Sequence, residues 1–372
     1  MLAFCFCAFV AFGVVLVLVG ANQDALAHAL DLDLAESGLL VSLLSLGLSV
    51  GVVAAGPLFD RLPRRPLFAG ALALAGLTLS SVGPGLTFSH WLVIVTLTGL
   101  GIGAYDTLIN AVVAQRFRHA SSRPMTIMHS AASVGAIAGP LLVVWISERS
   151  DWTNSFVVVG WAHLALAAAA LFVRFPEPEP SETMPWSRLL PALWPLGLAA
   201  FAYVGIEACM TLFAVPYAES LGLPEQRGQY GISLFWMGLL AGRLFIVTLG
   251  VGDARVVQVG GVAAALFLTA AVASATAAVG TSLLFVGAAL GGVYPVVIAL
   301  AGQRAPGAEG SAAGLVAGLG GIGGFAIPWV TGAVGDQGGV ALAYGSVALW
   351  CIAAAACAFI AHRRHSMGAS HA

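Results

Sequence analysis

The chain has 372 residues, of which 59% are hydrophobic and only 9% are charged, and its net charge is -2. A soluble domain carries about 25% charged residues. The composition therefore excludes a water-soluble domain and predicts an integral membrane protein, with the lipid bilayer as its surroundings and no nucleic-acid partner.

Apolar stretches of the length that spans a bilayer, about 20 residues, follow one another along the chain. Twelve such stretches are delimited by charged residues, Pro and Gly. They lie at about 4–28, 37–59, 66–84, 88–115, 125–147, 153–174, 189–218, 229–250, 256–277, 280–302, 311–333 and 339–361. The connections are short. We expect an all-α polytopic membrane protein with twelve transmembrane helices.

The first stretch ends in Ala25-Leu26-Ala27, which has the small-residue spacing of a signal-peptide cleavage site. No Lys or Arg precedes Arg61, and eleven more spans follow, so we expect this stretch to be a retained helix. Of the 15 basic residues, all Arg, every one except Arg149 and Arg227 falls on one side of the twelve-span arrangement. The positive-inside rule then predicts a multi-pass protein of the cell (inner) membrane with both termini cytoplasmic.

The chain repeats itself at half its length. A shift of 188 residues places Gly103 on Gly291, and a shift of 191 places Gly47 on Gly238. The repeat predicts two pseudo-symmetric six-helix halves, at 1–174 and 188–372 with a short cytoplasmic tail, joined by a Pro- and Glu-rich cytoplasmic linker at 175–187. In transporters built from such parallel repeats, the substrate site lies between the halves near the midplane of the membrane.

Asp106 is the only charge in the apolar stretch from Gly99 to Ala114. A carboxylate at that depth costs about 2.5–3.5 kcal/mol on insertion scales, so it should face a partner or a water-filled path. Asn110 lies one turn further on, on the same helix face. An acid that gains and loses a proton there can couple proton movement to a conformational change. The alternative is an acid that a neighbouring polar group satisfies for helix packing.

The segment Gly56-Pro-Leu-Phe-Asp60-Arg61-Leu-Pro-Arg64-Arg65 follows the second span. It resembles the signature loop G-x-L-x-D-R-x-G-R-R of the major facilitator superfamily, with Pro63 in place of the usual Gly. The resemblance implies the twelve-helix fold of that superfamily. It also implies a gating role for the acid at Asp60, which would pair with Arg groups and a helix end in the other half. We therefore expect the gating residues to be Asp60, Arg61, Arg64 and Arg65, with Arg243 a gate or a headgroup anchor at the cytoplasmic end of the eighth span.

Two further segments, Tyr105-Asp106-Thr107-Leu-Ile-Asn110 and Met128-His129-Ser130-Ala-Ala-Ser133-Val-Gly135, resemble the fourth and fifth helices of the fucose/galactose/glucose:proton symporter branch. Tyr203-Val-Gly-Ile-Glu207 is similar to its seventh helix. The resemblance implies that Asp106 is the proton-coupling acid. A second acid of that branch has Gly20 at its position here, with Asp24 one turn away, which leaves a two-carboxylate mechanism in doubt.

Other polar and aromatic residues of the spans complete the candidate site. For proton coupling we expect Asp106, Glu207 and the relay candidate His129, although a lone His is more often a helix-contact residue. Asp24 could instead lie solvated in the outer vestibule. The expected substrate-binding residues, which would offer hydrogen bonds or a stacking surface, are Asn22, Gln23, Asp24, Asn110, Tyr203, Thr211, Trp236 and Tyr294.

No cofactor or metal is expected. The five Cys lie inside predicted spans and are read as packing residues. The Gly-rich runs at 99–103 and 314–324 neither follow a strand nor carry the Lys of a phosphate-binding loop. Both runs, and the pair Gly287 and Gly291, are instead typical of close helix contacts.

These features favour a secondary active transporter that works by alternating access and is functional as a monomer. Its cargo would be a small polar solute, most simply a sugar or sugar-like molecule that moves with protons. A proton-driven exporter of drugs or metabolites and a transport-dead sensor remain alternatives. A membrane enzyme is not expected, because the sequence shows no cluster of acids and no paired nucleophile and base.

Overall fold

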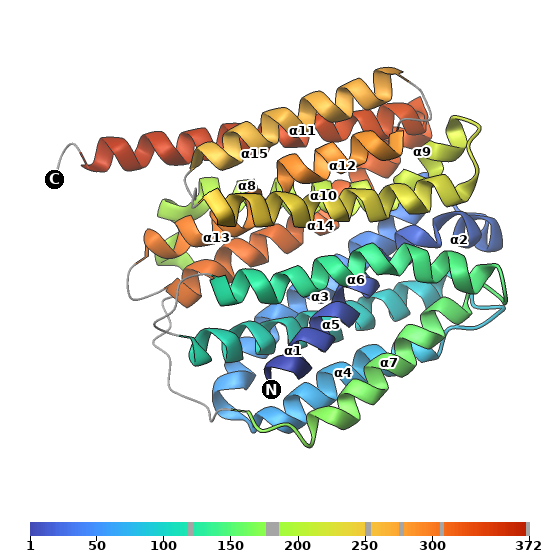
Figure 1. The fold of residues 1–372 in the computed structure, drawn as a ribbon, viewed down its shortest axis with the longest axis horizontal. Coiled ribbons are helices and arrows are strands. Elements are labelled where there is room, and N and C mark those ends of the chain that lie inside the picture. The colour runs from blue at the N-terminus through green and yellow to red at the C-terminus, as the bar shows by residue number, and fades with distance from the viewer. Residues whose placement is uncertain (118–122, 176–185, 250–253, 275–278, 306–308, 370–372) are drawn as a thin grey trace.

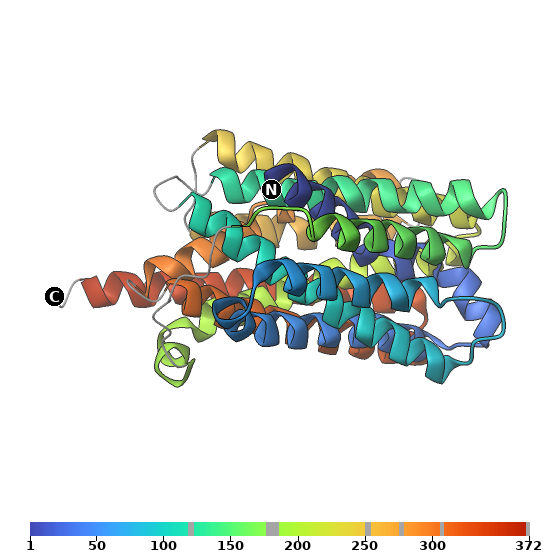
Figure 2. The ribbon, with the colours of Figure 1, turned by 90° about the horizontal axis from the view of Figure 1, so that it is seen from below.

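The computed structural model describes residues 1–117, 123–175, 186–249, 254–274, 279–305 and 309–369. Within these residues the chain forms helices that run side by side along one axis (Figures 1 and 2). The N-terminal segment contains α1 (Leu2–Ala21), α2 (Gln23–Leu30), α3 (Leu34–Arg61), α4 (Arg64–Ser80), α5 (Phe88–Arg116), α6 (Arg123–Ser147) and α7 (Asn154–Ala170). Most of the predicted linker lies outside the described residues.

The C-terminal segment contains α8 (Trp186–Leu212), α9 (Ala214–Ser220), α10 (Glu225–Leu249), α11 (Ala254–Ser274), α12 (Val279–Leu290), α13 (Val293–Gln303), α14 (Glu309–Gly338) and α15 (Val340–Ala369). In Figure 1 the blue-to-green helices of the N-terminal segment lie below the yellow-to-red helices of the C-terminal segment. The short helices α2 and α9 lie at the same end of the bundle, here called the α2 end.

The prediction of an all-α polytopic membrane protein is confirmed, and each of the twelve predicted spans falls on one helix or on two consecutive ones. Among the described residues, nine helical segments are long and apolar enough to cross a membrane. The other three predicted spans fall on α4 and α7, which have 17 residues each, and on α10, which carries Arg243. Short or charge-bearing helices of this kind need the neighbouring helices to cover them.

Three predicted spans, the first, the seventh and the tenth, each consist of two helices rather than one, which the sequence did not predict. The first breaks at Asn22, between α1 and α2, and the seventh breaks at Phe213, between α8 and α9. These two positions differ by 191, the offset of the sequence repeat. Interruptions at corresponding positions of two repeats mark the neighbourhood of a binding site in transporters.

Glycine contacts bring the same pair of helices together in each segment. A methyl group at Gly47 of α3 would overlap the backbone of α5 at Thr96, and one at Gly238 of α10 would overlap the backbone of α12 at Leu284. The reverse contacts repeat as well, with Gly99 and Gly103 of α5 against α3, and Gly287 and Gly291 against α10. The close helix contacts predicted at Gly99, Gly103, Gly287 and Gly291 are therefore confirmed.

The crossing of α1 and α6 yields a stability prediction. A Cβ atom at Gly135 would overlap the carbonyl oxygen of Val10, so Gly135→Ala must push α1 and α6 apart. We expect a loss of about 1–3 kcal/mol, typical of overpacking, seen as a lower apparent melting temperature in detergent. Gly70→Ala in α4 is the matched control, because a Cβ atom there meets nothing within 4 Å. Equal melting temperatures for the two variants would contradict the tight crossing.

Candidate functional site

Three polar side chains of the N-terminal segment form a chain in the middle of the bundle. Asn110 Nδ2 donates to Asp106 Oδ1 at 3.0 Å, and the Oδ1 atom of the same amide lies 3.1 Å from His129 Nε2. The amide therefore links the acid on α5 with the imidazole on α6. Asp106 and His129, which were predicted to lie near each other, are joined through Asn110.

A second polar group comes from the C-terminal segment. On α8 the hydroxyl of Tyr203 donates to Glu207 Oε1 at 3.3 Å. Arg243 of α10 donates to the hydroxyl oxygen of Tyr203 at 3.2 Å, and its Nη2 atom lies 3.8 Å from Glu207 Oε1. The ring of Tyr294 on α13 stacks on Tyr203, with centroids 5.5 Å apart.

Arg243 also joins the two segments, because its Nη1 atom donates to Ser133 Oγ on α6 at 2.8 Å. Its side chain is only 8% exposed. Headgroup anchoring, one of the two roles expected for Arg243, is therefore wrong: the guanidinium turns inward to the interface between the segments. The sequence reading placed it near a helix end because the apolar stretch stops shortly after it.

Four ionisable groups of the two networks are only partly buried. Asp106, His129, Glu207 and Tyr294 are each half-buried, whereas their neighbours Tyr105, Ile206 and Val293 are fully buried. Electrostatic interactions also cross the interface, between Tyr294 and Asp106 and between His129 and Arg243. The two networks therefore form one candidate site with contributions from both segments.

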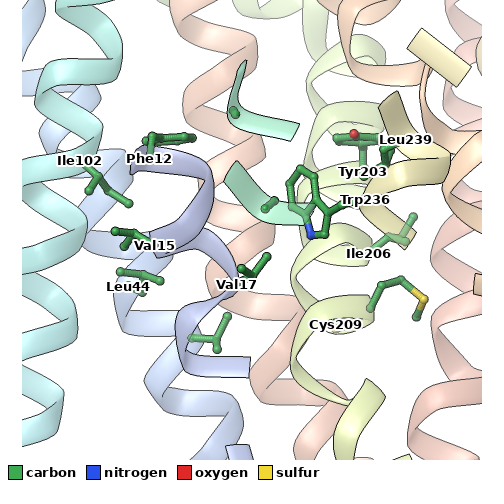
Figure 3. Packing of buried hydrophobic residues seen from close by; sticks show 14 of the residues in the cluster. Phe12, Val15, Val17, Leu44, Ile102, Tyr203, Ile206, Cys209, Trp236 and Leu239 are labelled. Atoms are coloured by element: carbon green, nitrogen blue, oxygen red, sulfur yellow. The ribbon is translucent and has the colours of Figure 1, made fainter. Parts of the chain in front are cut away.

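Thr211 and Trp236 extend the site toward the α2 end. Trp236 Nε1 donates to Thr211 Oγ1 at 3.4 Å, and Thr211 Oγ1 donates to the backbone oxygen of Glu207 at 3.0 Å. In the view of Figure 3 the indole ring lies between side chains of α1 and those of α8. Gly20 of α1 packs against the backbone of Thr211 so closely that a Cβ atom would overlap it. This contact leaves no room for a second acid at position 20.

Asn22, expected among the substrate-binding residues, has its side-chain amide bonded to other residues of the N-terminal segment. Asn22 Nδ2 donates to the backbone oxygen of Leu18 at 2.8 Å and to Ser155 Oγ at 3.1 Å. The amide thus ends α1 and ties it to α7, because the break in the helix leaves carbonyls that need donors. Gln23 is buried, and its Oε1 atom has no hydrogen-bond partner in the structure.

Asp24 lies at the α2 end, apart from the central networks. It pairs with His28 at 3.1 Å and faces Glu219, next to the end of α9, and Glu225, at the start of α10. Burial, together with the carboxylate of Asp24 and a hydrogen bond between the two acids, raises the pKa of Glu219 to about 7. The pKa of Glu225 is also raised, first by burial and then by Asp24. Asp24 therefore lies away from the central networks, and its neighbours at the α2 end contact it rather than leaving it simply solvated.

This cluster predicts that pH controls the contact between α2 and α9. A raised pKa means that the closed contact binds a proton more tightly than the open one. The stabilisation is therefore fully present below the ordinary pKa of 4.5 and is lost as the pH rises from there through about 7. With the native cysteines replaced and spin labels on Ala29 and Ser220, both exposed, the distance between labels should lengthen from pH 6 to pH 8.

Glu219→Gln mimics the protonated acid and should keep the labels close at both pH values. Glu148→Gln, an exposed acid paired with Arg149 instead, is the control and should behave like the parent protein. A pH response that survives in Glu219→Gln would assign the titration to another group.

The expected gating segment is more helical than predicted. Only Leu62 and Pro63 lie between α3 and α4, so the motif is spread over two helix ends rather than a loop. Leu62 is extended and Pro63 has φ -58°, which suits its ring and makes the turn without the usual Gly. Arg64 is buried and Arg65 exposed. The side chains of Asp60 and Arg61 lie outside what the structure describes.

His163 of α7 is fully buried. Its Nε2 atom lies 3.1 Å from the hydroxyl of Tyr105, and its Nδ1 atom lies 2.8 Å from the backbone oxygen of Val159. Both ring nitrogens therefore have partners inside the N-terminal segment, as in a packing residue.

Sequence reasoning missed Ser133 and Asp336. Ser133 belongs to the segment from Met128 to Gly135 that resembles a helix of the symporter branch, and it lies one turn after His129 on the same helix face. That spacing could have identified Ser133 as a site residue. Asp336, near the end of α14, accepts from the backbone N–H groups of Leu34 at 3.0 Å and Ala35 at 3.1 Å. No pattern in the sequence pairs Asp336 with a helix start more than three hundred residues away.

Membrane-length helices with ionisable side chains of both segments meeting between them are typical of membrane transporters. The sequence profile of the Major Facilitator Superfamily matches residues 4–328, and the chain belongs to this superfamily. The relatives described next are named as transporters of small solutes.

Among curated relatives, the glucose transport protein of Synechocystis sp. is 29% identical over 194 residues, 51% of this chain and 37% of that protein. The 4-hydroxybenzoate transporter PcaK of Pseudomonas putida is 29% identical over 164 residues, 43% of this chain and 36% of that protein. Each match spans little more than a third of the relative's length. A crystal structure of a D-xylose-proton symporter is 14% identical, with a TM-score of 0.77 over 97% of this chain and 96% of that one, and it supports the fold.

Proposed function

We propose that the chain is a proton-coupled symporter that carries a small polar solute, sugar or sugar-like, by alternating access. The observation that carries the proposal is the meeting of two ionisable networks at the interface of the segments: Asp106, Asn110 and His129 on one side, and Tyr203, Glu207 and Arg243 on the other. Ionisable groups at membrane depth are functional groups by default, because their burial is costly.

In this proposal Asp106 is the proton-coupling acid. When it is protonated, its charge no longer opposes passage of the site through an apolar constriction, so the proton biases the conformational equilibrium. Asn110 would hold the acid and His129 in fixed positions, and His129 would exchange protons with the acid through water rather than through the amide, which does not conduct protons. Glu207, paired with Arg243, would be the second acid whose protonation changes the site.

Two partly exposed residues support a solute with hydroxyl groups: Asn110 offers hydrogen bonds, and the ring of Tyr294 offers a stacking surface for a sugar ring. Thr211 and Trp236 are buried, at 4% and 2% exposed, and would contact the solute only after the site opens. The Synechocystis relative is named for glucose transport. Other relatives are named for 4-hydroxybenzoate and gallate transport, so the relatives do not single out sugars.

We propose that the α2 end faces the outside of the cell, since most Arg residues were assigned to the opposite side. Hydrogen bonds join the two segments between the α2 end and the middle of the bundle. They link Asp336 with Leu34, Gln229 with Ala21, and Arg243 with Ser133. In this orientation the structure is closed on the outer side. The predicted halves, 1–174 and 188–372, would then rock about the central site.

Accumulation driven by a pH gradient tests the proposal. Proteoliposomes with an alkaline interior should concentrate a transported monosaccharide, and an ionophore that collapses the gradient should release it. Equilibration without accumulation would make the protein a facilitator. Solute loss driven by an acidic interior would instead favour the efflux antiporter, and binding without any flux would favour the sensor.

A further inference from the structure

The guanidinium of Arg243 has an unfilled donor at Nε, and Nη2 carries a second N–H group beyond the one that donates to Tyr203. Nη1 donates to Ser133 and Nη2 donates to Tyr203, but Nε is buried and has no hydrogen-bond partner in the structure. The nearest acid, Glu207, lies 3.8 Å from Nη2, which is longer than a hydrogen bond. The side chain is more than nine-tenths buried, with 8% exposed.

An unfilled guanidinium edge is shaped for a carboxylate. The Nε and Nη2 atoms form a planar fork that donates two parallel hydrogen bonds to the two oxygens of one carboxylate. A buried donor without an acceptor costs free energy, so an acceptor that arrives with a solute gains more here than it would at the surface. A neutral hydroxyl could satisfy only one of the two N–H groups.

We propose that the transported solute is a small ring-bearing monocarboxylate whose carboxylate binds the Nε edge of Arg243, in competition with Glu207. The inference rests on the proton-coupled transport proposed for this site, and it replaces the neutral sugar of that proposal with an acid. The ring would lie against the stacked pair of Tyr203 and Tyr294, whose planes are inclined by 26°. A planar aromatic acid and a pyranose acid share this chemistry, and the experiment separates them.

The charges at the site connect this solute to proton movement. The titratable groups that interact with Arg243 are Tyr203 and Glu207 on α8, Tyr294 on α13 and His129 on α6. One guanidinium cannot compensate two carboxylates equally well in a poorly solvated site. Protonation of Glu207 leaves the positive charge of Arg243 free for the carboxylate of the solute, so an acid and a proton enter together.

The test measures binding to the purified full chain by calorimetry, with two matched pairs of probes: galactose and galacturonate, and benzyl alcohol and benzoate. We expect at least one acid to bind about tenfold or more tightly than its neutral counterpart. The preferred pair identifies the kind of ring. Failure of both acids to bind, or equal binding of acid and neutral probes, would overturn the inference.

Variants separate recognition from a structural role. Arg243→Gln should abolish the preference for the acid. That variant leaves the carboxylate of Glu207 without its positive partner. The double variant Arg243→Gln with Glu207→Gln removes both charges, and it should lose the preference for the acid in the same way. Glu207→Gln alone should tighten binding of the acid and weaken its pH dependence, which a mere tie between segments would not do. An acid preference that survives the loss of Arg243 overturns the inference.

The proposed function fails in a different way. If galactose moves together with protons and galacturonate does not bind, symport stands and the carboxylate assignment falls. If an acid binds through Arg243 but crosses without protons, the carboxylate assignment stands and proton coupling falls.

Discussion

Asp106→Asn should abolish proton-driven accumulation while leaving exchange of solute across the membrane intact. The amide keeps the shape of the carboxyl group and an oxygen that can accept from Asn110 Nδ2, the bond that measures 3.0 Å in the structure. It cannot bind or release a proton. The loaded carrier can therefore still cross between its two states, but the crossing no longer moves a proton.

The effect is large. For one proton per solute, a gradient of one pH unit sustains about tenfold accumulation, whereas the variant should stop at equal concentrations inside and outside. The measurement compares accumulation with counterflow, the exchange of labelled for unlabelled solute, in the same proteoliposomes. Asp31→Asn is the control, because Asp31 ends α2 in the left-handed region, with φ 54°, which Asn also tolerates.

Asp31→Asn should accumulate solute like the parent protein. Accumulation that persists in Asp106→Asn would move the coupling role to Glu207 or His129. Loss of both accumulation and counterflow would show instead that Asp106 is needed for solute binding or for the fold.

Asp336→Ala should open the α2 end. The carboxylate of Asp336 accepts from the first two backbone N–H groups of α3, whereas Asp33 accepts from the third at 2.7 Å. The start of α3 is thus capped by one residue from each segment. Loss of a cap costs about 0.5–2 kcal/mol, which shifts the equilibrium between closed and open about 2- to 30-fold.

Spin labels on Ala29 and Ser220 report this change as a larger population of long distances. The matched control is Glu36→Gln, in the same turn of α3, whose side chain accepts from Asp33 N at 3.2 Å within the N-terminal segment. Its distance distribution should be unchanged. Identical distributions for the two variants would show that the Asp336 contact does not hold the segments together.

The sequence predicted the helices well because membrane burial leaves a strong signal. Long apolar runs with sparse charge admit few other structures, and the glycine contacts of α3 with α5 follow from small residues at fixed spacing. The breaks at Asn22 and Phe213 were not predicted, because a continuous apolar sequence looks the same whether or not one of its residues leaves the helical conformation.

The candidate site was predictable where its members share a helix. Asp106 with Asn110, and Tyr203 with Glu207, are one turn apart, and their hydrogen bonds follow from that spacing. Contacts between distant helices have no such signal. The inward turn of Arg243 toward Ser133, and the pairing of Asn22 with Ser155, depend on how the helices pack.

The most direct test of proton coupling at this interface is the internal pH of proteoliposomes when a solute is added outside, recorded with an enclosed pH dye. The parent protein should acidify the interior with one sugar or acid of the panel, and Asp106→Asn should not. Flux of that solute without any change in internal pH would contradict proton coupling and leave Asp106 a binding or packing residue.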